Sequence, residues 1–411
     1  MRAIPILALA IFMTSVAFPE DGGSNYSIYG IGDLRYAANV RNAGMGYAGI
    51  GLPAANYINR LSPATWARIQ QTRLEASFLY EGFNSTDGKR SNYIANSDFN
   101  GALLAIPISP AHGIVVVSGF TPYSNVNYNI FTTGSEEGIN YTINHLGTGG
   151  LGTGQIGLSY APLADLSFGA SFNYLFGSLD NSRTFTPTST SFAGGKTVET
   201  TKINGITVSL GGVFTGFGSI SESLRPFSIG FVISSRGNLN TKRQLAYEFQ
   251  SELDSSEEFK GKLVVPITYG FGVGYQPSER FLFAADYYAQ PWEDAEFNGV
   301  NPSEIRNSYR FGLGAERLPV REFNASWLNR FAYRLGFYYI STYYRINGEP
   351  INEWGLTGGF AMPLSGSTRL NVAVEYGRRG TTSHNLIKDN IFRISTSINI
   401  GELWFVRFEE E

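Results

Sequence analysis

The stretch NAGMGYAGIGLPAANYINRLSPA, residues 42–64, decides how the rest of the chain is interpreted. Its backbone contains four closely spaced glycines, which are Gly44, Gly46, Gly49 and Gly51. Glycine allows positive φ angles and close approach of other backbone. Pro53 and Pro63 disfavour regular strand pairing, and most of the remaining side chains are small or apolar, so the stretch can be buried. We predict that it forms a plug around which the later chain closes.

Three of these glycines also match Gly-x-Gly-x-x-Gly, the phosphate-binding pattern of dinucleotide-binding folds. That pattern needs a buried strand before it and a helix after it. Here Gly30 and Gly32 interrupt the preceding residues, and Pro53 falls where the helix would run. We therefore expect no nucleotide and no other cofactor.

The composition narrows the class of protein. Of 411 residues, 16% are charged, against ~25% in ordinary soluble proteins, while 14% are aromatic and 48 are glycine. The net charge of −3 gives no basic excess for binding nucleic acid. The chain contains no cysteine, so it has no disulfides and no thiolate sites. Low charge with abundant glycine, tyrosine and phenylalanine is typical of membrane β-barrels with aromatic girdles.

The first 17 residues have the pattern of a secretory signal peptide. Arg2 is followed by an apolar run from residue 3 to 13, and Ser15-Val16-Ala17 provides small residues for cleavage. No later segment is apolar over the ~18 residues that a spanning helix needs. We therefore expect an exported chain without transmembrane helices.

Beyond residue 71 the sequence alternates with period two, as strands do. In residues 165–178, Phe168 and Phe172 alternate with Ser171 and other small or polar residues, and Val374 and Ala373 alternate similarly later in the chain. The outer face of a soluble β-sandwich is usually rich in Lys, Glu and Thr, whereas this second face is mainly Gly, Ser, Ala and Asn. Such a face suits the crowded interior of a barrel. Phe172 and Val374 are therefore predicted to face lipid.

The spacing of these segments predicts about fourteen strands, an even number as in bacterial barrels. We expect them near residues 72–83, 98–107, 113–128, 150–161, 165–178, 202–216, 225–236, 262–276, 279–290, 305–318, 329–341, 353–363, 367–378 and 387–400.

The connections alternate between short and long. Residues 107–112 and 363–366 are tight, proline-containing turns, whereas the partner links are long and polar. We expect loops at 84–97, 129–149, 179–202, 237–261 and 291–303. Short periplasmic turns and long extracellular loops are typical of outer-membrane barrels, which places both termini in the periplasm.

The predicted fold is an all-β membrane protein, an antiparallel transmembrane β-barrel with an N-terminal plug, in the outer membrane of a Gram-negative bacterium. The expected divisions are a signal peptide (1–17), the plug (18–71), the barrel (72–400) and a periplasmic tail (401–411).

Charged residues at inward positions of the strands are candidate lumen groups. They are Glu75, Asp286, Arg310, Arg334, Arg369, Glu375 and Arg393. Charges are costly on a lipid face, so a polar lumen is their natural location. There they could pair with the plug or form a ladder that contacts a substrate, and the sequence leaves both interpretations open.

No catalytic or metal-binding pattern emerges. His112, His145 and His384 are far apart in sequence, without metal-ligand spacing. We therefore predict that the protein is not an enzyme and has no metal site.

Several motifs carry a resemblance to a known family. They are Asn42-Ala43-Gly44-Met45-Gly46, Ala48-Gly49-Ile50, Tyr57-Ile58-Asn59 leading into Ser62-Pro63-Ala64, and the closing Gly401-Glu402-Leu403-Trp404-Phe405. They resemble the FadL-type outer-membrane channels for long-chain fatty acids and other hydrophobic compounds, in particular variants from Bacteroidetes-like and Chlorobi-like bacteria. That family has an Asn-Pro-Ala turn in its hatch, where this chain has Ser62 in place of the asparagine.

The resemblance implies passive uptake of a hydrophobic molecule, with hatch movement and exit through a kink in the third strand. The candidate kink is the stretch VVVSGFTP, which Gly119 interrupts and Pro122 ends. A second candidate is Pro266. In the alternative interpretation each proline simply marks a strand end.

The expected partners are outer-membrane lipid and a hydrophobic small molecule. Two other functions stay open: a secretion-associated barrel, like the FadL-related shuttle of the type IX system that holds exported proteins, and a structural or adhesive barrel. Partly apolar segments in the long links, at 128–131 and 244–249, favour uptake.

Overall fold

The computed structural model describes residues 23–36, 39–136, 138–189, 191–249, 252–255, 258–320 and 326–403. The predicted signal peptide and residues 404–411 of the predicted tail lie outside the described residues. In the described part of the chain, no helix has the length and apolar character needed to cross a membrane.

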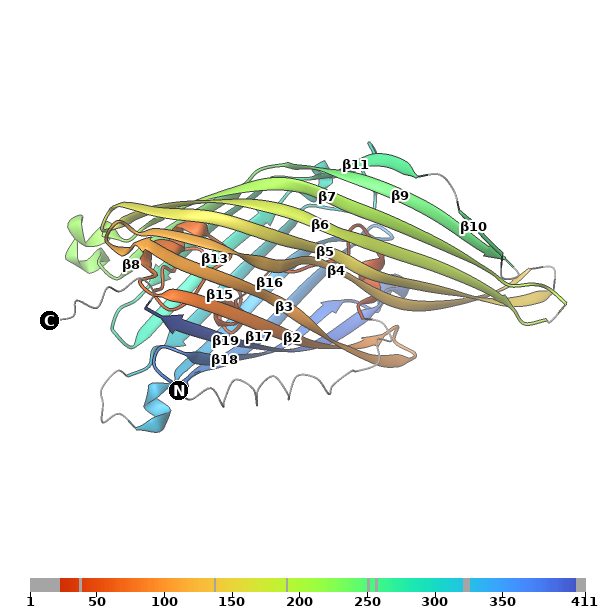
Figure 1. Ribbon diagram of the computed structural model, residues 1–411. Coiled ribbons are helices and arrows are strands. Elements are labelled where there is room, and N and C mark those ends of the chain that lie inside the picture. Colours follow the sequence, from red (N-terminus) through yellow and green to blue (C-terminus); the bar gives the residue numbers. More distant parts are fainter. Residues whose placement is uncertain are drawn as a thin grey trace, which may run out of the picture.

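A single antiparallel sheet closes into a barrel (Figure 1). The last strand pairs with the first strand of the wall, from Lys388↔Thr86 to Glu402↔Thr72, which closes the sheet. The strands are β1 (Asp33–Leu34), β2 (Thr72–Thr86), β3 (Ser91–Ser109), β4 (Ile114–Glu136), β5 (Ile139–Leu163), β6 (Leu166–Pro187), β7 (Gly195–Phe214), β8 (Phe227–Ser234), β9 (Gly237–Phe249), β10 (Glu252–Ser255), β11 (Phe259–Val265), β12 (Thr268–Tyr275), β13 (Phe281–Gln290), β14 (Glu296–Phe297), β15 (Ser308–Arg317), β16 (Ala332–Ile346), β17 (Glu349–Pro363), β18 (Arg369–Gly380) and β19 (Lys388–Glu402).

These strands make fourteen crossings of the wall. β8 and β9 pair with successive parts of β7 and together form one crossing. β12 and β11 pair with β8 and β9 and together form the next crossing. β13 and β14 together form the next crossing, because they pair with β12 and β11. β10 is the return arm of the hairpin with β9, and β1 belongs to the N-terminal segment. The predicted barrel of about fourteen antiparallel strands is confirmed.

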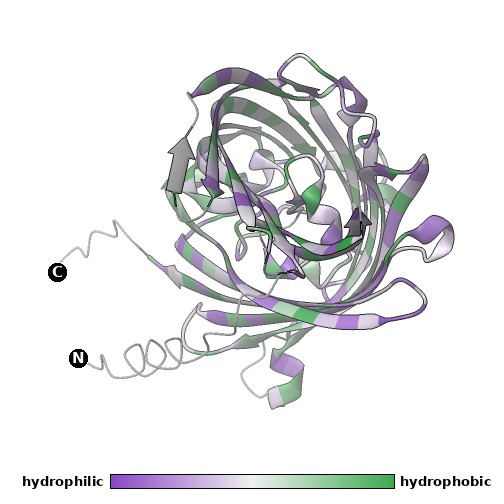
Figure 2. Cartoon of the chain, turned by 90° about the vertical axis from the view of Figure 1, so that its right-hand side faces the viewer, coloured by the Kyte–Doolittle hydropathy of each residue, from purple (hydrophilic) through white to green (hydrophobic). Residues whose placement is uncertain are grey.

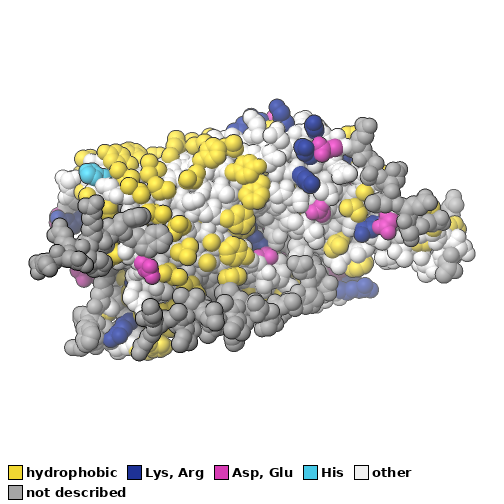
Figure 3. Space-filling model, in the orientation of Figure 1, with side chains coloured by type: hydrophobic (Ala, Val, Ile, Leu, Met, Phe, Trp, Pro, Cys, Tyr) yellow, Lys and Arg dark blue, Asp and Glu magenta, His cyan; other side chains and the backbone are white. Residues whose placement is uncertain are grey.

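The two faces of the wall differ as the alternation predicts. Phe172 and Val374 are 45% and 41% exposed, whereas Ser171 and Ala373 are buried. Outward hydrophobic side chains form a broad belt around part of the barrel, which is coloured yellow in Figure 3. Such a belt matches the hydrocarbon layer of a membrane.

The long links at 84–97, 129–149, 179–202 and 237–261 consist mostly of strand, so the prediction of loops there is wrong. The strands continue as paired hairpin arms, for example to Glu136↔Ile139, and β4, β5, β6, β7 and β9 project beyond the barrel (Figure 1). These arms are rich in Thr, Asn and Gly, which resemble loop composition, but their backbone groups still pair. We call this end of the barrel the hairpin end and the opposite one the turn end.

The N-terminal segment runs through the inside of the barrel (Figure 2). We call residues 23–36 the strap and residues 39–71 the plug. In the plug, Met45, Ala48 and Leu52 pack with the wall residues Leu282 and Ala284. The helical turns are η1 (Asn25–Ile28), α2 (Val40–Ala43) and η2 (Pro63–Arg68) within this segment, and η3 (Pro110–His112), η4 (Gly216–Ser219), η5 (Glu222–Leu224), η6 (Trp292–Asp294), η7 (Trp327–Arg330) and η8 (Ser383–Asn385) between strands.

Candidate functional site

The plug contacts the wall backbone to backbone. Gly46 has a φ of +62°, and a Cβ there would lie 2.3 Å from the carbonyl oxygen of Phe337 on β16. On the wall, a Cβ at Gly312 or Gly336 would lie 2.3 or 2.1 Å from backbone atoms of Gly46. Glycine is therefore required on both sides of this contact.

The other plug glycines differ in how tightly they are enclosed. A Cβ at Gly49 would collide with the Asn42 side chain, and one at Gly51 would lie 2.7 Å from the carbonyl oxygen of Gly272. Gly44 has ordinary van der Waals space, with its nearest neighbours at 3.5 Å.

Asn59 holds the plug in its fold. Its Nδ2 donates to the carbonyl of Gly49 over 2.7 Å, and its Oδ1 accepts from the backbone N–H of Leu61 over 3.0 Å. Its own carbonyl accepts from the indole N–H of Trp66. A single side chain therefore ties the glycine-rich half of the plug to its C-terminal half.

The Ser62-Pro63-Ala64 turn lies against wall glycines. A Cβ at Gly169 would lie 2.4 Å from the carbonyl carbon of Pro63, and one at Gly211 would lie 2.6 Å from Ser62 Oγ. Within the described residues, the buried Ser62 hydroxyl has no hydrogen-bond partner.

A buried cluster of charges joins the plug to β15 and β16. Glu316 accepts from Arg41 of the plug over 2.6 Å and from Arg334 of the wall over 2.8 Å. Arg334 also donates to the hydroxyl of Tyr57 over 2.7 Å. The side chains of Glu316 and Arg334 are completely buried, so each depends on the other for compensation.

A second cluster joins the strap to β2 and β19. Arg35 contacts Glu81 over 2.5 Å, and Arg393 contacts the same carboxylate over 3.0 Å. Arg393 also bonds Glu375 on β18 and lies 3.0 Å from Glu353 on β17. The strap therefore contributes a cation to a network that spans four strands.

The remaining predicted lumen charges occupy separate positions. Asp286 accepts from the backbone N–H groups of Gly49 and Ile50 over 2.7 and 2.8 Å. Glu75 accepts from Asn399, and the guanidinium of Arg310 lies 5.1 Å from the ring centre of Tyr36. Arg369 lies apart from all of these, half-buried at the turn end.

Sequence reasoning missed several members of these clusters. They are Arg35, Arg41, Glu81, Glu316, Glu353 and, in a third buried group with Asp33 of the strap, Arg379 and Asp389. The wall residues among them share the inward parity of their strands, a signal that could have found them. Arg35 of the strap and Arg41 of the plug carry no such signal.

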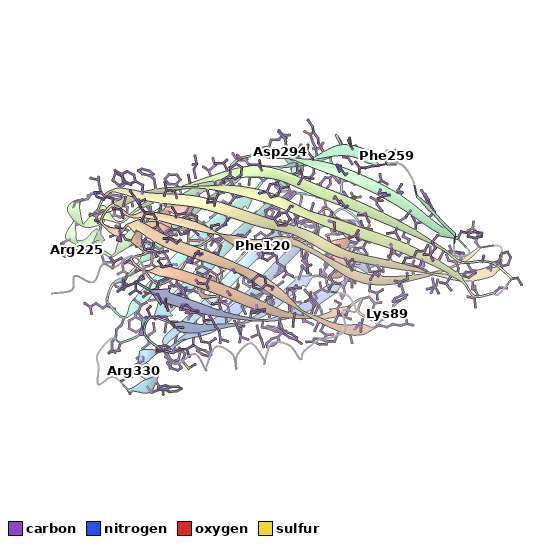
Figure 4. The ribbon with its side chains drawn as sticks, in the orientation of Figure 1. Lys89, Phe120, Arg225, Phe259, Asp294 and Arg330 are labelled. Atoms are coloured by element: carbon purple, nitrogen blue, oxygen red, sulfur yellow. The ribbon has the colours of Figure 1, made fainter. Side chains whose placement is uncertain are left out.

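The wall is interrupted between β3 and β4. Their pairing runs from Ser109↔Ile114 to Ala102↔Phe120, and in the described residues it goes no further, although β4 continues to Glu136. Phe120 lies near the middle of the barrel in Figure 4 and is 37% exposed on the outer face. The interruption is therefore level with the apolar belt.

The strap and the plug occupy this gap. The strap strand β1 pairs with β4 at Asp33↔Asn125 and Leu34↔Ser124. Arg60 of the plug donates to the carbonyl of Pro122 over 2.8 Å, and burial lowers the pKa of Arg60 to about 10.

The two predicted wall residues near the gap differ in role. Gly119 still pairs with β3 and β5, and a Cβ there would lie 2.1 Å from the carbonyl oxygen of Ala102. Pro122 lies just beyond the last β3 pair, beside a register shift in the pairing with β5.

Pro266 interrupts the wall in a milder way. β11 ends at Val265 and β12 begins at Thr268, but these pieces pair with β9 and β8, so the crossing continues. The carbonyl of Pro266 accepts from Gln290 over 3.4 Å, and Gln290 also lies 3.4 Å from the hydroxyl of Tyr123.

A cavity of about 130 Å³ lies between the strap, the plug and the wall. Arg60, Tyr123 and Pro266 all line it, so it adjoins both interruptions. Its other lining residues include Leu34, Tyr36, Gln155, Ser171, Asn173, Leu175, Val232 and Tyr288.

Towards the hairpin end, the inward face becomes apolar. The strap residues Tyr26 and Ile31 pack there into a buried hydrophobic cluster. Its wall members include Val126, Tyr128, Leu151, Leu179, Ile203, Leu239 and Leu263. This packed apolar cluster fills the inside of the barrel towards the hairpin end, where its Tyr26 lies against Arg379, which pairs with Asp33 and Asp389.

A closed sheet, an apolar outer belt and a filled lumen define a transmembrane β-barrel of the outer-membrane type with an internal N-terminal segment. The BamG family model matches residues 1–409, and the chain belongs to this family. No curated protein matches the chain.

Solved structures of similar fold include hydrocarbon channels. The CymD monoaromatic hydrocarbon channel shares 14% identity over 92% of this chain and 100% of its own, with a TM-score of 0.59. The toluene transporter TbuX of Ralstonia pickettii shares 14% sequence identity over 89% of this chain and 99% of its own, with a TM-score of 0.59. A FadL homologue from Pseudomonas aeruginosa shares 12% sequence identity over 90% of this chain and 98% of its own, with a TM-score of 0.59. The predicted resemblance to FadL-type barrels is confirmed for the fold.

Proposed function

We propose that this protein is an outer-membrane channel for the passive uptake of long-chain fatty acids or other hydrophobic compounds. The observation that carries the proposal is the end of the β3–β4 ladder at Phe120, level with the apolar belt and beside a lumen cavity. A broken ladder in hydrocarbon leaves backbone groups that other protein must satisfy. Here β1 and Arg60 supply those partners.

The proposed path begins at the apolar inward face of the hairpin end. A hydrophobic molecule partitions onto that face, reaches the cavity, and leaves sideways between β3 and β4 into the membrane. Lateral exit avoids the charged turn end, because a hydrophobic molecule is more stable in the adjacent lipid than in a polar lumen. Movement of the strap and plug away from β4 opens the gap. The solved hydrocarbon channels of similar fold support this function.

We infer that the hairpin end is extracellular and both termini are periplasmic. Short turns at one end and long hairpins at the other follow the usual arrangement of outer-membrane barrels.

A cysteine pair between the strap and β4 tests the proposed opening of the gap directly, because the chain has no cysteine of its own. We call this opening the lateral gate. Leu34 and Ser124 are cross-strand partners, so Leu34→Cys with Ser124→Cys places two thiols within bonding range. We expect oxidation to lower the initial uptake rate of radiolabelled palmitate into proteoliposomes at least tenfold. A reductant should restore the rate.

The matched control is Leu356→Cys with Tyr376→Cys, a cross-strand pair on an uninterrupted ladder. Its oxidation should leave uptake unchanged. Full uptake through the oxidised Leu34–Ser124 pair would refute the lateral gate. Absence of palmitate uptake by the reduced protein, together with absence of toluene uptake, would refute the transport function itself.

The projecting sheet favours a second candidate function, a secretion-associated barrel that holds exported proteins. The strap reaches β4 as far as Asn127, whose backbone N–H and carbonyl both bond the Ser27 hydroxyl over 3.1 Å. Beyond Asn127, no described residue of β3 or of the strap pairs with β4, so this edge of the strand lacks a strand partner up to Glu136. Free edges accept extended segments of other chains. Co-purification of an exported protein that is lost when residues 129–149 are shortened would support this candidate.

A further inference from the structure

Three lysines lie side by side on the outer face near the hairpin end. Lys202 on β7 pairs directly with Lys242 on β9, and Lys242 pairs directly with Lys260 on β11. All three side chains are exposed. Like charges directly opposite each other on adjacent strands are destabilising, and Glu258 compensates only the middle lysine, so this row favours a further anion.

A second row of outward-facing residues lies two residues along each strand from the first, on the side of the apolar belt. Asn204 pairs with Asn240, and Asn240 pairs with Lys262 on β11. Below this row on β7 comes Ile206, which is 48% exposed and belongs to the belt. The two rows form a flat grid of four ammonium and two carboxamide groups. We call these six residues the lysine grid.

The neighbouring acidic groups are placed away from the membrane. Glu258 lies 3.2 Å from Lys242, and Asp180 on β6 accepts from Thr200. Both carboxylates lie on the side of the grid that is farther from the apolar belt. On the belt side, Glu296 is paired with Arg236 over 3.0 Å. Within the described chain, Lys202, Lys260 and Lys262 have no ion-pair partner.

Figure 3 shows dark blue side chains, with some magenta acidic ones among them, beyond the yellow belt over the part of the wall where β7, β9 and β11 run in Figure 1. The four residue steps from Ile206 to Lys202 span ~13 Å along a strand. Because the strands are tilted, the height gained is about 10 Å. The polar layer of a bilayer is about 5–7 Å thick on each side, and lysine side chains can reach down into it.

We propose that the lysine grid binds the phosphorylated headgroup of a lipid in the leaflet at the hairpin end. Phosphate supplies the compensating charge, and the carboxamides donate to its oxygens or to neighbouring hydroxyls. Clustered lysines beside a membrane attract anionic lipid in this way. The site is separate from the lumen and does not depend on the transport function.

The test uses native mass spectrometry of the purified, detergent-extracted full chain. The probe is bisphosphorylated lipid A, compared with the same lipid after enzymatic removal of its phosphates. We expect the wild-type protein to retain one bisphosphorylated molecule and to bind the dephosphorylated one at least tenfold more weakly. Excess inorganic phosphate should not displace the lipid, because acyl contacts with the belt add to the headgroup contacts.

The variant Lys202→Gln/Lys242→Gln/Lys260→Gln should bind bisphosphorylated lipid A at least tenfold more weakly than wild type. The control Lys89→Gln/Arg90→Gln/Arg378→Gln removes three exposed positive charges elsewhere and should bind as wild type does. Heat-modifiable migration on gels checks that each variant is folded. Equal retention by the grid variant, displacement by inorganic phosphate, or capture of an acidic protein in place of lipid would overturn the proposal.

Discussion

On β15 and β16 the plug is held by fully buried charges and by backbone contact at glycines. Beyond Phe120, by contrast, the N-terminal segment is held to β4 by hydrogen bonds: two strand pairs, the N–H of Arg35 and the hydroxyl of Ser27 from the strap, and the guanidinium of Arg60 from the plug. Removing one partner of a buried ion pair typically costs about 3–5 kcal/mol. A net hydrogen bond contributes about 1 kcal/mol. The difference supports the proposal that the N-terminal segment separates from β4 while its contacts with β15 and β16 hold.

The largest effect is expected on the anchored side. Glu316→Gln leaves Arg41 and Arg334 buried without their shared carboxylate, which should lower the free energy of unfolding by about 3–5 kcal/mol. Urea titration in lipid vesicles measures this loss. The control Glu222→Gln breaks an exposed pair with Arg225 and should cost less than about 1 kcal/mol. Equal losses for both variants would remove the distinction between the two sides.

The outer and inner faces give the next effect. Phe172→Arg places a charge on the lipid-facing belt and should lower the free energy of unfolding by about 2–4 kcal/mol near the midplane. Ser171→Arg places the same charge beside the lumen cavity and should cost less. The same titration compares them, and a reversed order would show that the two faces are misassigned.

Backbone contact between plug and wall gives a third effect. Gly46→Ala and Gly366→Ala both introduce a Cβ at similar positive φ, +62° and +57°, but nothing lies within 4 Å of the added Cβ at Gly366. We expect Gly46→Ala to cost about 1–3 kcal/mol more, the usual range for overpacking. Thermal melting in detergent, followed by gel mobility, separates the two. Matching melting curves would mean that the plug does not press on β15 and β16.

The smallest change in stability is expected at the gap. Arg60→Gln removes the hydrogen bond to Pro122 but also removes a buried charge, so the free energy of unfolding should change by about 1 kcal/mol or less. Ion leak through planar bilayers should rise nonetheless, because the plug loses a contact with β4. Arg41→Gln on the anchored side provides the comparison. Leak unchanged by Arg60→Gln but raised by Arg41→Gln would reverse the proposed roles of the two sides.

Much of the barrel follows from local sequence. Alternation in residues such as Phe172 and Ser171 identifies the strands and their faces, because lipid and lumen impose opposite polarities. The hairpin arms could not be recognised in the same way. Outside the membrane both of their faces meet water, so the alternation that marks a strand disappears while the backbone pairing persists.

The site was less accessible to prediction. Glu375 and Arg393 were recognised as lumen charges from strand parity, but Arg35, which shares the Glu81 carboxylate with Arg393, lies in an irregular segment without periodicity. The wall gap arises because β3 stops pairing with β4 at Phe120. Such a gap depends on both strands together, so the sequence of either strand alone does not reveal it. Pro122 and Pro266 look alike in sequence. Only the pairing of the adjacent strands shows that Pro122 lies at a gap in the wall and that Pro266 lies at a bend in a continuous crossing.

Arg35 has a consequence for the order of assembly. Its carboxylate partner Glu81 is on β2 and also binds Arg393 on β19, so the three charges lie across the seam that joins the first and last wall strands. The N-terminal segment is synthesised first, and the final strand completes the cylinder. Closure without Arg35 would leave Glu81 to Arg393, a cation that Glu375 and Glu353 already share. We therefore expect insertion of the N-terminal segment and pairing of the last strand to be coupled, so that a chain lacking β19 leaves its N-terminal segment open to proteolysis.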